Sequence, residues 1–548
     1  MFKSGGEGRH GTGGRARVRA GSAAVAVVCL LGAAGCTTRG HAAGASPHTA
    51  TSSAASAGTP AARSSTRAEG GSPRPSDGTA ASGWGVTASW VEQENAKTGT
   101  SAWRIGAQSG APIGGYADAT QAVAGQRVRL FVSTTAPTFT AQAFRMGYYG
   151  GEQARLVWTS PATPGGQQPR CPLTPGVNMV SCSWRPSLAF TVAAGWPPGD
   201  YLLRLQAAGG QASYVPLTVA DPASDATYLV QNDVLTWQAW NAYGGYDMYG
   251  GGPPGRTPTY AGRARVLSYD RPYLYGNGAA DFLGNELPLV SFMEQHGLDV
   301  TYVTDVYLNE HPAAMLGHKA FLSLGHDECW AMAQRDGVIQ AIKHGVNAVF
   351  FGASPILRHV RLQPSPLGPD REMVDYRDPT QDPIFRRDPR DATGNTWAQP
   401  PADDPASVIT GNTYGGYGID AAMVVSDAAS WPFAGTGLRD GAALPHVVRS
   451  DYDHVVPRQP GPADVQVLTR SPVTTPYGVH STANMTYYTD PSSQAGVIAT
   501  GTNAWIASLA SCPPGTAPCP AAAVQRITGN ILRVFGNGPA GATNPSQP

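Results

Sequence analysis

The chain carries little charge for its length. Only 14% of its 548 residues are Asp, Glu, Lys or Arg, and 38 basic residues balance 38 acidic ones. Because no basic field is available to hold a phosphate backbone, we expect no nucleic-acid partner. Glycine and proline are abundant instead, with 67 and 47 residues, so loops should be long and helices few. The length exceeds what one core usually supports and predicts two folded domains with tails.

Long apolar runs are scarce too, and the one near the N-terminus is too short to span a bilayer. Basic residues from Lys3 to Arg19 precede the apolar stretch 23–34, and small residues then lead into Cys36. This order predicts an export signal over residues 1–36. Its end resembles the lipobox of bacterial lipoproteins, so we expect a membrane lipoprotein that faces the outside and is lipidated at Cys36. An ordinary signal, which would leave a secreted protein, is the alternative.

Residues 37–82 hardly contain an aromatic side chain and consist mainly of Ala, Ser, Thr, Gly and Pro. Such a segment cannot bury enough apolar surface to offset the entropy of ordering it. We therefore predict a disordered tether between the membrane and the folded domains.

Cysteine is rare, with seven residues in the chain. In the folded part Cys171 and Cys182 are close in sequence, as are Cys512 and Cys519. Two local disulfides, Cys171–Cys182 and Cys512–Cys519, are the simplest pairing in an oxidising compartment. Cys329 is then left without a partner.

Helical periodicity is missing from residues 83–222, the first predicted domain. Short runs with apolar residues at alternate positions, punctuated by Gly and Pro, predict strands here. Several short strands without helices favour a β-sandwich. The predicted strands are 126–134, 140–146, 154–158, 188–192, 201–205 and 214–219.

Strands and helices alternate over residues 223–540, the second predicted domain, which favours a doubly wound α/β sheet. Residues 320–324 and 346–351 are two apolar strands with an amphipathic helix between them. Regularity fades from 363 to 463, where we expect long irregular connections. The other predicted elements are strands at 226–230, 265–269 and 299–303 and helices at 281–296 and 521–535.

Four ionisable side chains directly follow the strand 320–324: His326, Asp327, Glu328 and Cys329. Ligands collect at the carboxyl ends of parallel strands, so this turn is the candidate site. His326 and Glu328 offer a nitrogen and a carboxylate to a metal ion or to a water being activated. The alternative is structural, with Asp327 capping the next helix and Glu328 in its first turn.

A loop rich in aromatic residues and glycine spans residues 236–249. Its rings, which include Trp237, Trp240, Tyr243 and Tyr246, suit the wall of a pocket. A surface lid of stacked rings is the alternative.

From about Glu92 to Arg533 the sequence resembles the large (beta) subunit of N,N-dimethylformamidase and related actinobacterial proteins. The resemblance implies a glutamine-amidotransferase-like α/β fold for the second domain. It also implies an iron held by two tyrosines and one glutamate, which activates water against a small amide. Six stretches carry the resemblance in the same order: FRMGYYGG at 144–151, GDYLLRL at 199–205, TWQAWNAYGG at 236–245, LGHDECW at 324–330, GVNAVFFG at 345–352 and ATGTNAW at 499–505.

The resemblance also suggests roles for particular residues. Glu328 matches the glutamate ligand and His326 the histidine beside it. Tyr201 and, from the aromatic loop, Tyr243 are the candidates for the tyrosine ligands. Asp451 takes the place of a later glutamate and joins His326 and Glu328 as a candidate catalytic residue.

The sequence departs from the family pattern around this site. Trp240 and Cys329 replace tyrosines, and Ser354 replaces an asparagine after the second strand of the βαβ unit. We expect these three residues to line the pocket, with Trp237 and Tyr246. An indole nitrogen has no free lone pair, so a metal would lose a ligand if Trp240 occupied a ligand position.

Three functions are compatible with these features. The first is an exported hydrolase of amide-like C–N bonds, with iron or another metal at Glu328. The second is a surface binding protein that keeps the fold, has lost the iron site and binds an envelope ligand. The third is a nucleophilic enzyme in which His326 activates Cys329. The sequence leaves open whether a small subunit exists and how many copies assemble.

Overall fold

The computed structural model describes residues 79–512 and 519–548. The predicted export signal, Cys36 and almost all of the predicted tether lie outside the described residues. The described residues belong to one compact unit, and the domain boundary near residue 222 stays a prediction. No helix in these two ranges is long and apolar enough to cross a membrane.

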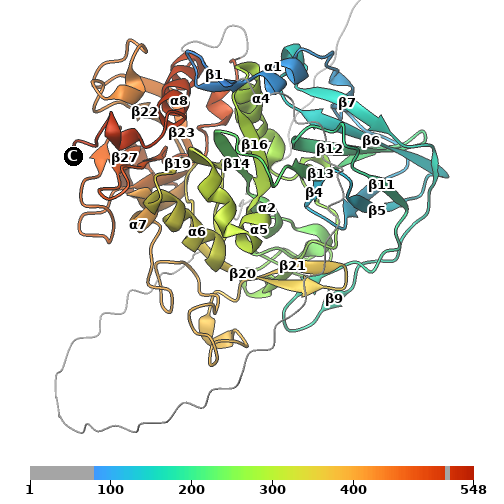
Figure 1. The fold of residues 1–548 in the computed structure, drawn as a ribbon. Helices are drawn as coiled ribbons and strands as arrows, with labels where there is room; N and C mark the ends of the chain where they lie inside the picture. The colour runs from blue at the N-terminus through green and yellow to red at the C-terminus, as the bar shows by residue number, and fades with distance from the viewer. Residues whose placement is uncertain (1–78, 513–518) are drawn as a thin grey trace, which may run out of the picture. The chain divides into compact units, whose positions relative to one another are not determined.

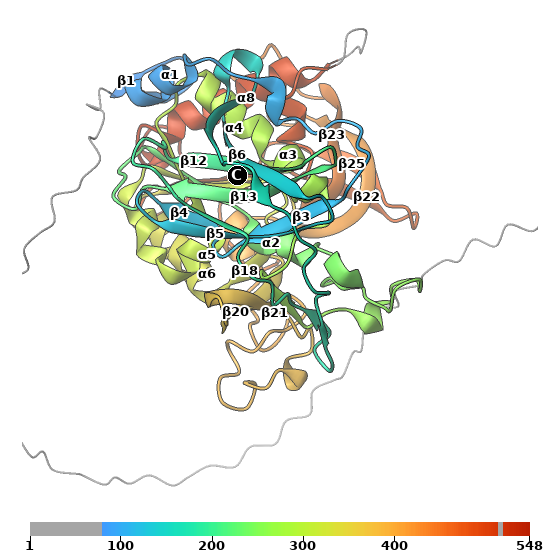
Figure 2. The same ribbon diagram turned by 90° about the vertical axis from the view of Figure 1, so that its right-hand side faces the viewer.

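All six strands predicted between residues 126 and 219 are present, with small shifts at their ends. They belong to two sheets, one with the order β11–β5–β3 and the other with the order β4–β13–β12–β6–β7, in which β8 also pairs with β6. Figure 2 brings several of these strands to the front. Their bounds are β3 Ile113–Ala117, β4 Gln121–Val123, β5 Arg127–Thr134, β6 Thr138–Met146, β7 Ala154–Thr159, β8 Thr163–Pro164, β11 Leu188–Thr191, β12 Gly199–Ala207 and β13 Ala212–Ala220.

The two sheets share one apolar core. Val128 and Leu130 of β5 belong to the same buried cluster as Ala141 of β6 and Leu203 and Leu205 of β12. Successive side chains of a strand face opposite sides, so the alternation in the sequence supplies each sheet with one apolar face. Burial of these faces against each other holds the two sheets together.

A seven-stranded sheet organises the C-terminal part (Figure 1), with the order β16–β14–β17–β19–β28–β27–β24. The first five strands are parallel, and the last two join in antiparallel fashion. The bounds are β14 Tyr228–Asn232, β16 Val300–Thr304, β17 Ala320–Leu324, β19 Asn347–Phe351, β24 Gln466–Val467, β27 Thr486–Thr489 and β28 Gly496–Ala499.

Helices cover both faces of this sheet. Tyr228 and Val230 of β14 belong to the same apolar cluster as residues of α4 and α8. Leu229, which faces the other way, belongs with Phe321 to the cluster that contains residues of α5 and α6. Both faces of the strands are therefore buried, as their continuous apolar runs predict. The helices are α4 Leu287–Gln295, α5 Asp305–Glu310, α6 Met332–Lys343 and α8 Ala521–Phe535.

Three predictions for this part are corrected by the structure. The strand predicted at 265–269 belongs to a separate four-stranded sheet, β15–β21–β20–β18. The helix predicted at 281–296 is broken at Glu286, which has non-helical backbone angles. The range 363–463 contains two paired strands of 12 residues each, β22 and β23. The bounds are β15 Val266–Ser268, α3 Phe282–Asn285, β18 Cys329–Ala331, β20 Arg358–Ser365, β21 Gly368–Val374, β22 Thr413–Val424 and β23 Ala443–His454.

Both predicted disulfides are confirmed, Cys171–Cys182 and Cys512–Cys519. Cys329 is a free, buried cysteine.

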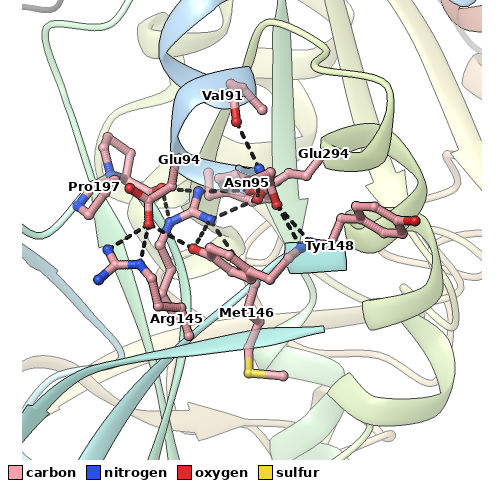
Figure 3. A network of polar contacts seen from close by, with 12 residues as sticks. Val91, Glu94, Asn95, Arg145, Met146, Tyr148, Pro197 and Glu294 are labelled. Carbon is pink, nitrogen blue, oxygen red and sulfur yellow. Dashed lines mark hydrogen bonds and ion pairs between the residues drawn. The ribbon is translucent and has the colours of Figure 1, made fainter. Parts of the chain in front are cut away.

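A buried ion pair joins β6 to α4. Arg145 donates to both carboxylate oxygens of Glu294 at 2.7 Å, and neither side chain is exposed. Tyr302 and Asn95 donate to the same carboxylate at 2.9 and 2.8 Å. Figure 3 shows Arg145, Glu294 and Asn95 within this network. The network also explains Gly147 in the FRMGYYGG stretch, because a Cβ at this position would lie 2.3 Å from a Glu294 oxygen.

Candidate functional site

The turn that follows β17 carries the candidate residues. A close backbone approach at Gly352 and hydrogen bonds to the Thr236 side chain hold it in place. A Cβ at residue 352 would lie 1.5 Å from the carbonyl oxygen of Gly325, so Gly352 is required for the ends of β17 and β19 to approach. Thr236 Oγ1 accepts hydrogen bonds from the backbone N–H groups of Glu328 and Cys329 at 3.0 and 3.1 Å. These bonds attach the turn to α2 (Val234–Ala239).

Asp327 does not cap the following helix. Helix α6 begins at Met332, after the short strand β18. Asp327 instead accepts hydrogen bonds from Gln231 and Ser323 at 2.6 and 2.7 Å, and burial raises the pKa of its carboxyl well above the usual value. Asp327 therefore ties the turn to β14 and β17.

Glu328 is a buried carboxylate with a partner on each oxygen. Its Oε1 accepts from Arg358 Nε at 3.0 Å, and its Oε2 accepts from the hydroxyl of Tyr249. Burial by itself raises the pKa of Glu328, but the charges of Arg358 and His326 and the Tyr249 hydrogen bond outweigh burial and lower the pKa. Glu328 is therefore ionised at neutral pH.

His326 lies among three carboxylates. Its Nε2 is 3.6 Å from Glu328 Oε2 and 3.7 Å from Asp451 Oδ2, and its Nδ1 is 3.8 Å from Asp281 Oδ2. Burial by itself lowers the pKa of the imidazole, but the three carboxylates outweigh burial and raise it to about 10. The ring is thus a cation at neutral pH, with a donor on each nitrogen.

Asp451 lies on β23 at an irregularity of the β22–β23 pair. Tyr417 and Gly418 of β22 oppose Asp451 alone, and the preceding Ser450 has a φ of 67°. Such bulges re-aim side chains and are frequent beside functional sites. This bulge places the Asp451 carboxylate near His326, which follows β17.

The neighbours of Asp451 offset only part of the effect of burial on its carboxyl group. Ser354, which follows β19, donates to Asp451 Oδ2 at 3.1 Å. Burial raises the pKa of Asp451, and the charge of Glu328 adds to this effect, while His326 opposes it. Asp451 therefore binds a proton more readily than Glu328.

Glu328 influences the pKa of two tyrosine hydroxyls. Tyr249 donates to its Oε2, and Tyr414 of β22 lies near enough to Asp451 and Glu328 to feel their charges. Burial raises the pKa of both hydroxyls, and the charge of Glu328 adds to the effect on each. Tyr249 therefore contacts Glu328 directly, whereas Tyr414 is linked to it only through the effect of charge on its pKa.

A pocket of about 490 Å³ opens beside His326. Trp240 forms part of its wall and is 40% exposed. The Trp240 ring stacks on Tyr249 with 4.0 Å between centroids and lies 5.6 Å from the His326 ring. Of His326 and the three carboxylates around it, His326 and Asp281 line the pocket. The lining also includes Leu274, Tyr275, Arg449, Ser450 and Asn503.

The tyrosines expected to hold a metal are placed elsewhere. The Tyr201 hydroxyl donates to the carbonyl oxygen of Pro197 at 2.8 Å, and its ring stacks on Trp196 within the β-rich core. Tyr243 packs against the cluster that contains Cys182. The structure does not bring Tyr201 or Tyr243 to Glu328.

Four further residues were expected to line the pocket beside Trp240. Ser354 contacts Asp451, as described above. Cys329 is buried behind the turn, and burial raises the pKa of its thiol well above the usual value. Trp237 is buried, and its indole donates to Glu286 at 2.8 Å, while Tyr246 lines a separate surface depression.

Sequence reasoning missed Tyr249, Asp281, Arg358 and Tyr414. Tyr249 ends the aromatic loop, so its residue type and place in the chain could have suggested it. Arg358 lies 30 residues after Glu328, and Asp281 and Tyr414 are contributed by other elements. No local spacing links these three to the turn.

Parallel strands covered by helices, with a histidine among carboxylates at a strand end, define an α/β protein with its candidate site at the carboxyl edge of the sheet. The model of the family described as N,N-dimethylformamidase beta subunit-like, C-terminal, matches residues 140–519. The chain belongs to this family, which confirms the resemblance found in the six sequence stretches. No match to a curated protein was found.

Proposed function

We propose that the protein hydrolyses an amide-like C–N bond in the pocket beside His326. The observation that carries the proposal is a cluster of a cationic imidazole, an ionised carboxylate and a carboxyl with a raised pKa, of which the imidazole of His326 lines the pocket. Groups whose pKa values are pushed apart in this way suit acid and base roles. Membership of the N,N-dimethylformamidase beta subunit-like family supports an amide as the substrate class.

Asp451 and His326 divide the proton transfers in this proposal. Asp451, with its raised pKa, accepts a proton from the water that attacks the amide carbon. His326 donates a hydrogen bond to the carbonyl oxygen as negative charge develops there, and then a proton to the leaving nitrogen. The C–N bond breaks, and the products are a carboxylic acid and an amine.

An iron ion at Glu328 would have to share the carboxylate with Arg358 and Tyr249, which now contact its two oxygens. Within residues 79–512 and 519–548 no three His, Cys, Asp or Glu side chains converge closely enough to hold a metal. Tyr249 and Tyr414 would supply the two phenol oxygens, and Arg358 would orient the Glu328 carboxylate from behind. Bound iron would lower the pKa of a water and polarise the amide carbonyl.

Ligand binding without turnover is the alternative function. Arg358 favours it, because a guanidinium on Glu328 Oε1 competes with any other cation for that oxygen. A Cys329-dependent mechanism has less support. The thiolate is the nucleophilic form, and burial of Cys329 disfavours that form.

We also propose finer features of the fold and the location. A β-sandwich is supported by the shared core of the two sheets. A glutamine-amidotransferase-like, doubly wound domain is supported by five parallel strands with helices on both faces. Export and a lipid anchor at Cys36 are supported by the two disulfides, since disulfides persist in oxidising compartments.

The test is amine release from a panel of formamides, acetamides and N-acyl amino acids, together with the iron content of the purified protein. We expect turnover of at least one amide and close to one iron per chain, with both lost in Glu328→Ala. The exposed Glu152 provides the control Glu152→Ala, which should change neither. Unchanged turnover in Glu328→Ala contradicts the proposal, and tight binding of an amide without turnover supports the alternative.

A further inference from the structure

The pocket beside His326 is larger than a simple formamide requires. Its volume of about 490 Å³ lies within the range of roughly 300–1,000 Å³ that holds ligands of many atoms. A substrate that fills the pocket therefore has groups beyond the amide itself. The lining residues indicate the chemistry of those groups.

Arg449 gives this pocket a cation without a partner. Its guanidinium has no hydrogen bond or ion pair with any residue in the described parts of the chain, although its backbone N–H donates to Thr502 Oγ1 at 3.1 Å. Asp420 is its cross-strand neighbour, but the Asp420 carboxylate accepts from His446 Nδ1 at 2.7 Å instead. Arg449 is therefore available to a ligand.

The acidic side chains near the pocket face other cations. Asp281 and Asp451 both face His326, at 3.8 and 3.7 Å, and Glu328 is paired with Arg358 at 3.0 Å. The cations that face these three carboxylates are thus His326 and Arg358. Arg449 forms no ion pair with any of them in the described parts of the chain.

Two neutral donors also line the pocket. Ser450 follows it directly on β23 and lines the pocket. Asn503 also lines the pocket, and its Oδ1 accepts from the backbone N–H of Ala353 at 3.0 Å, which leaves its NH₂ group free to donate. A guanidinium, a hydroxyl and an amide NH₂ together suit a carboxylate, which accepts hydrogen bonds on both oxygens.

Apart from Asp281 and Asn285, the remaining lining consists of Trp240, Ala242, Leu274, Tyr275, Ala504 and Ala507. Leu274 is 61% exposed and Trp240 is 40% exposed, and both line the pocket with Tyr275. Exposed large apolar side chains around a cavity are typical of a surface that binds an apolar group.

We propose that the substrate is an amide that carries a carboxylate, as an N-acyl amino acid does, and that Arg449 binds this carboxylate. This inference rests on the proposed hydrolase function. The amide lies at His326, and the apolar part of the acyl group lies against Trp240 and Leu274. Arg449 is then a specificity-determining residue that takes no part in the proton transfers.

The test compares the binding of two probes that differ at one terminal group, N-benzoylglycine with a carboxylate and N-benzoylglycinamide with a neutral carboxamide. Calorimetric titration of the full folded protein measures both affinities, and release of glycine or glycinamide measures turnover of the benzamide bond that they share. Because a charge-assisted pair with an arginine is worth on the order of tenfold in affinity, we expect N-benzoylglycine to bind about tenfold tighter. Added salt should weaken this preference.

Variants at Arg449 decide the assignment. Arg449→Gln should remove the preference for the carboxylate and leave the binding of the neutral probe unchanged, while Arg449→Lys should keep part of the preference. Arg439 is exposed in the same hairpin and does not line the pocket, so Arg439→Gln is the matched control and should behave like the wild type. The inference is overturned if the wild type does not bind N-benzoylglycine, binds both probes equally, or keeps its preference in Arg449→Gln.

The two measurements separate this inference from the hydrolase proposal. If binding prefers the carboxylate and depends on Arg449 but no turnover follows, the carboxylate site is supported and the hydrolase proposal is contradicted. Equal hydrolysis of both probes supports the hydrolase and removes the carboxylate site.

Discussion

Two buried glutamates of this protein show that similar side chains can build either a scaffold or a site. Glu294 and Glu328 both face an arginine and a tyrosine hydroxyl, and both are shielded from solvent. Each cluster also connects segments that are far apart in the sequence. The partners are Arg145 and Tyr302 for Glu294 and Arg358 and Tyr249 for Glu328.

The two clusters differ in how completely their polar atoms are paired. Every polar partner of Glu294 lies within 2.9 Å, and neither Glu294 nor Arg145 is exposed. The contact between Glu328 and His326 is 3.6 Å, longer than a hydrogen bond, and the imidazole lines a pocket. Burial and charge are therefore alike in the two clusters, and the proposed site differs from the scaffold in its incomplete pairing beside a cavity.

The largest effect should come from breaking the scaffold cluster. Arg145→Met leaves the Glu294 carboxylate buried without its cation, and removing one partner of a buried pair typically costs about 3–5 kcal/mol of unfolding free energy. Urea unfolding measures the loss. Arg204→Met on the neighbouring strand β12 is the control, and we expect a change below about 1 kcal/mol. Equal losses in the two variants would show that the Glu294 cluster is not a scaffold.

Glu328→Gln should affect catalysis where Arg145→Met affects folding. Loss of the carboxylate charge should lower kcat/KM for a panel amide by about 10²–10³-fold, as removal of one group that stabilises a transition state does. The protein should remain folded with some loss of stability, because the glutamine can still accept from Tyr249 while Arg358 loses its ionised partner. The rates are measured together with the unfolding free energy of each variant. Retained activity in Glu328→Gln would place the chemistry elsewhere.

The pH dependence of stability should separate the clusters further, because His326 titrates and Arg145 does not. The pKa of His326 is about 10 in the folded protein, above its unfolded value of about 6.5. Its contribution to stability is thus complete below about pH 6.5 and is lost as the pH rises through about 10. Wild type should lose stability relative to His326→Gln over this window, measured by urea unfolding at pH 6, 8 and 10. Parallel pH profiles would contradict the charge assigned to His326.

The smallest effect is expected at Cys329. Cys329→Ala should leave amide turnover unchanged and lower the unfolding free energy by about 1 kcal/mol, because it removes a small buried side chain that is not a nucleophile in this account. Loss of amide turnover in Cys329→Ala would instead support the mechanism in which Cys329 is the nucleophile.

The sequence predicted the local parts of the fold and only half of the site. Strand 320–324 and helix 521–535 were predicted with their observed bounds, because apolar periodicity is a local signal. Strands β22 and β23 were missed, since Gly415, Gly416 and Gly418 and the bulge at Ser450 interrupt their alternation.

The site was predicted where its residues are neighbours in the chain. His326 and Glu328 come from one turn, and the family resemblance added Asp451. Tyr414, Arg358 and Asp281 reach the same place only through tertiary packing, which no spacing in the sequence records. Tyr201 was proposed as a metal ligand from the resemblance, but its hydroxyl is occupied by the carbonyl oxygen of Pro197.

A crystal structure of the protein with N-benzoylglycine is the most direct test of the claim that His326, Glu328 and Asp451 form one functional centre. The account predicts the ligand in the pocket lined by Trp240, with its amide carbonyl within hydrogen-bond distance of His326. A ligand bound at another surface, or a His326 ring turned away from Glu328 and Asp451, would contradict it.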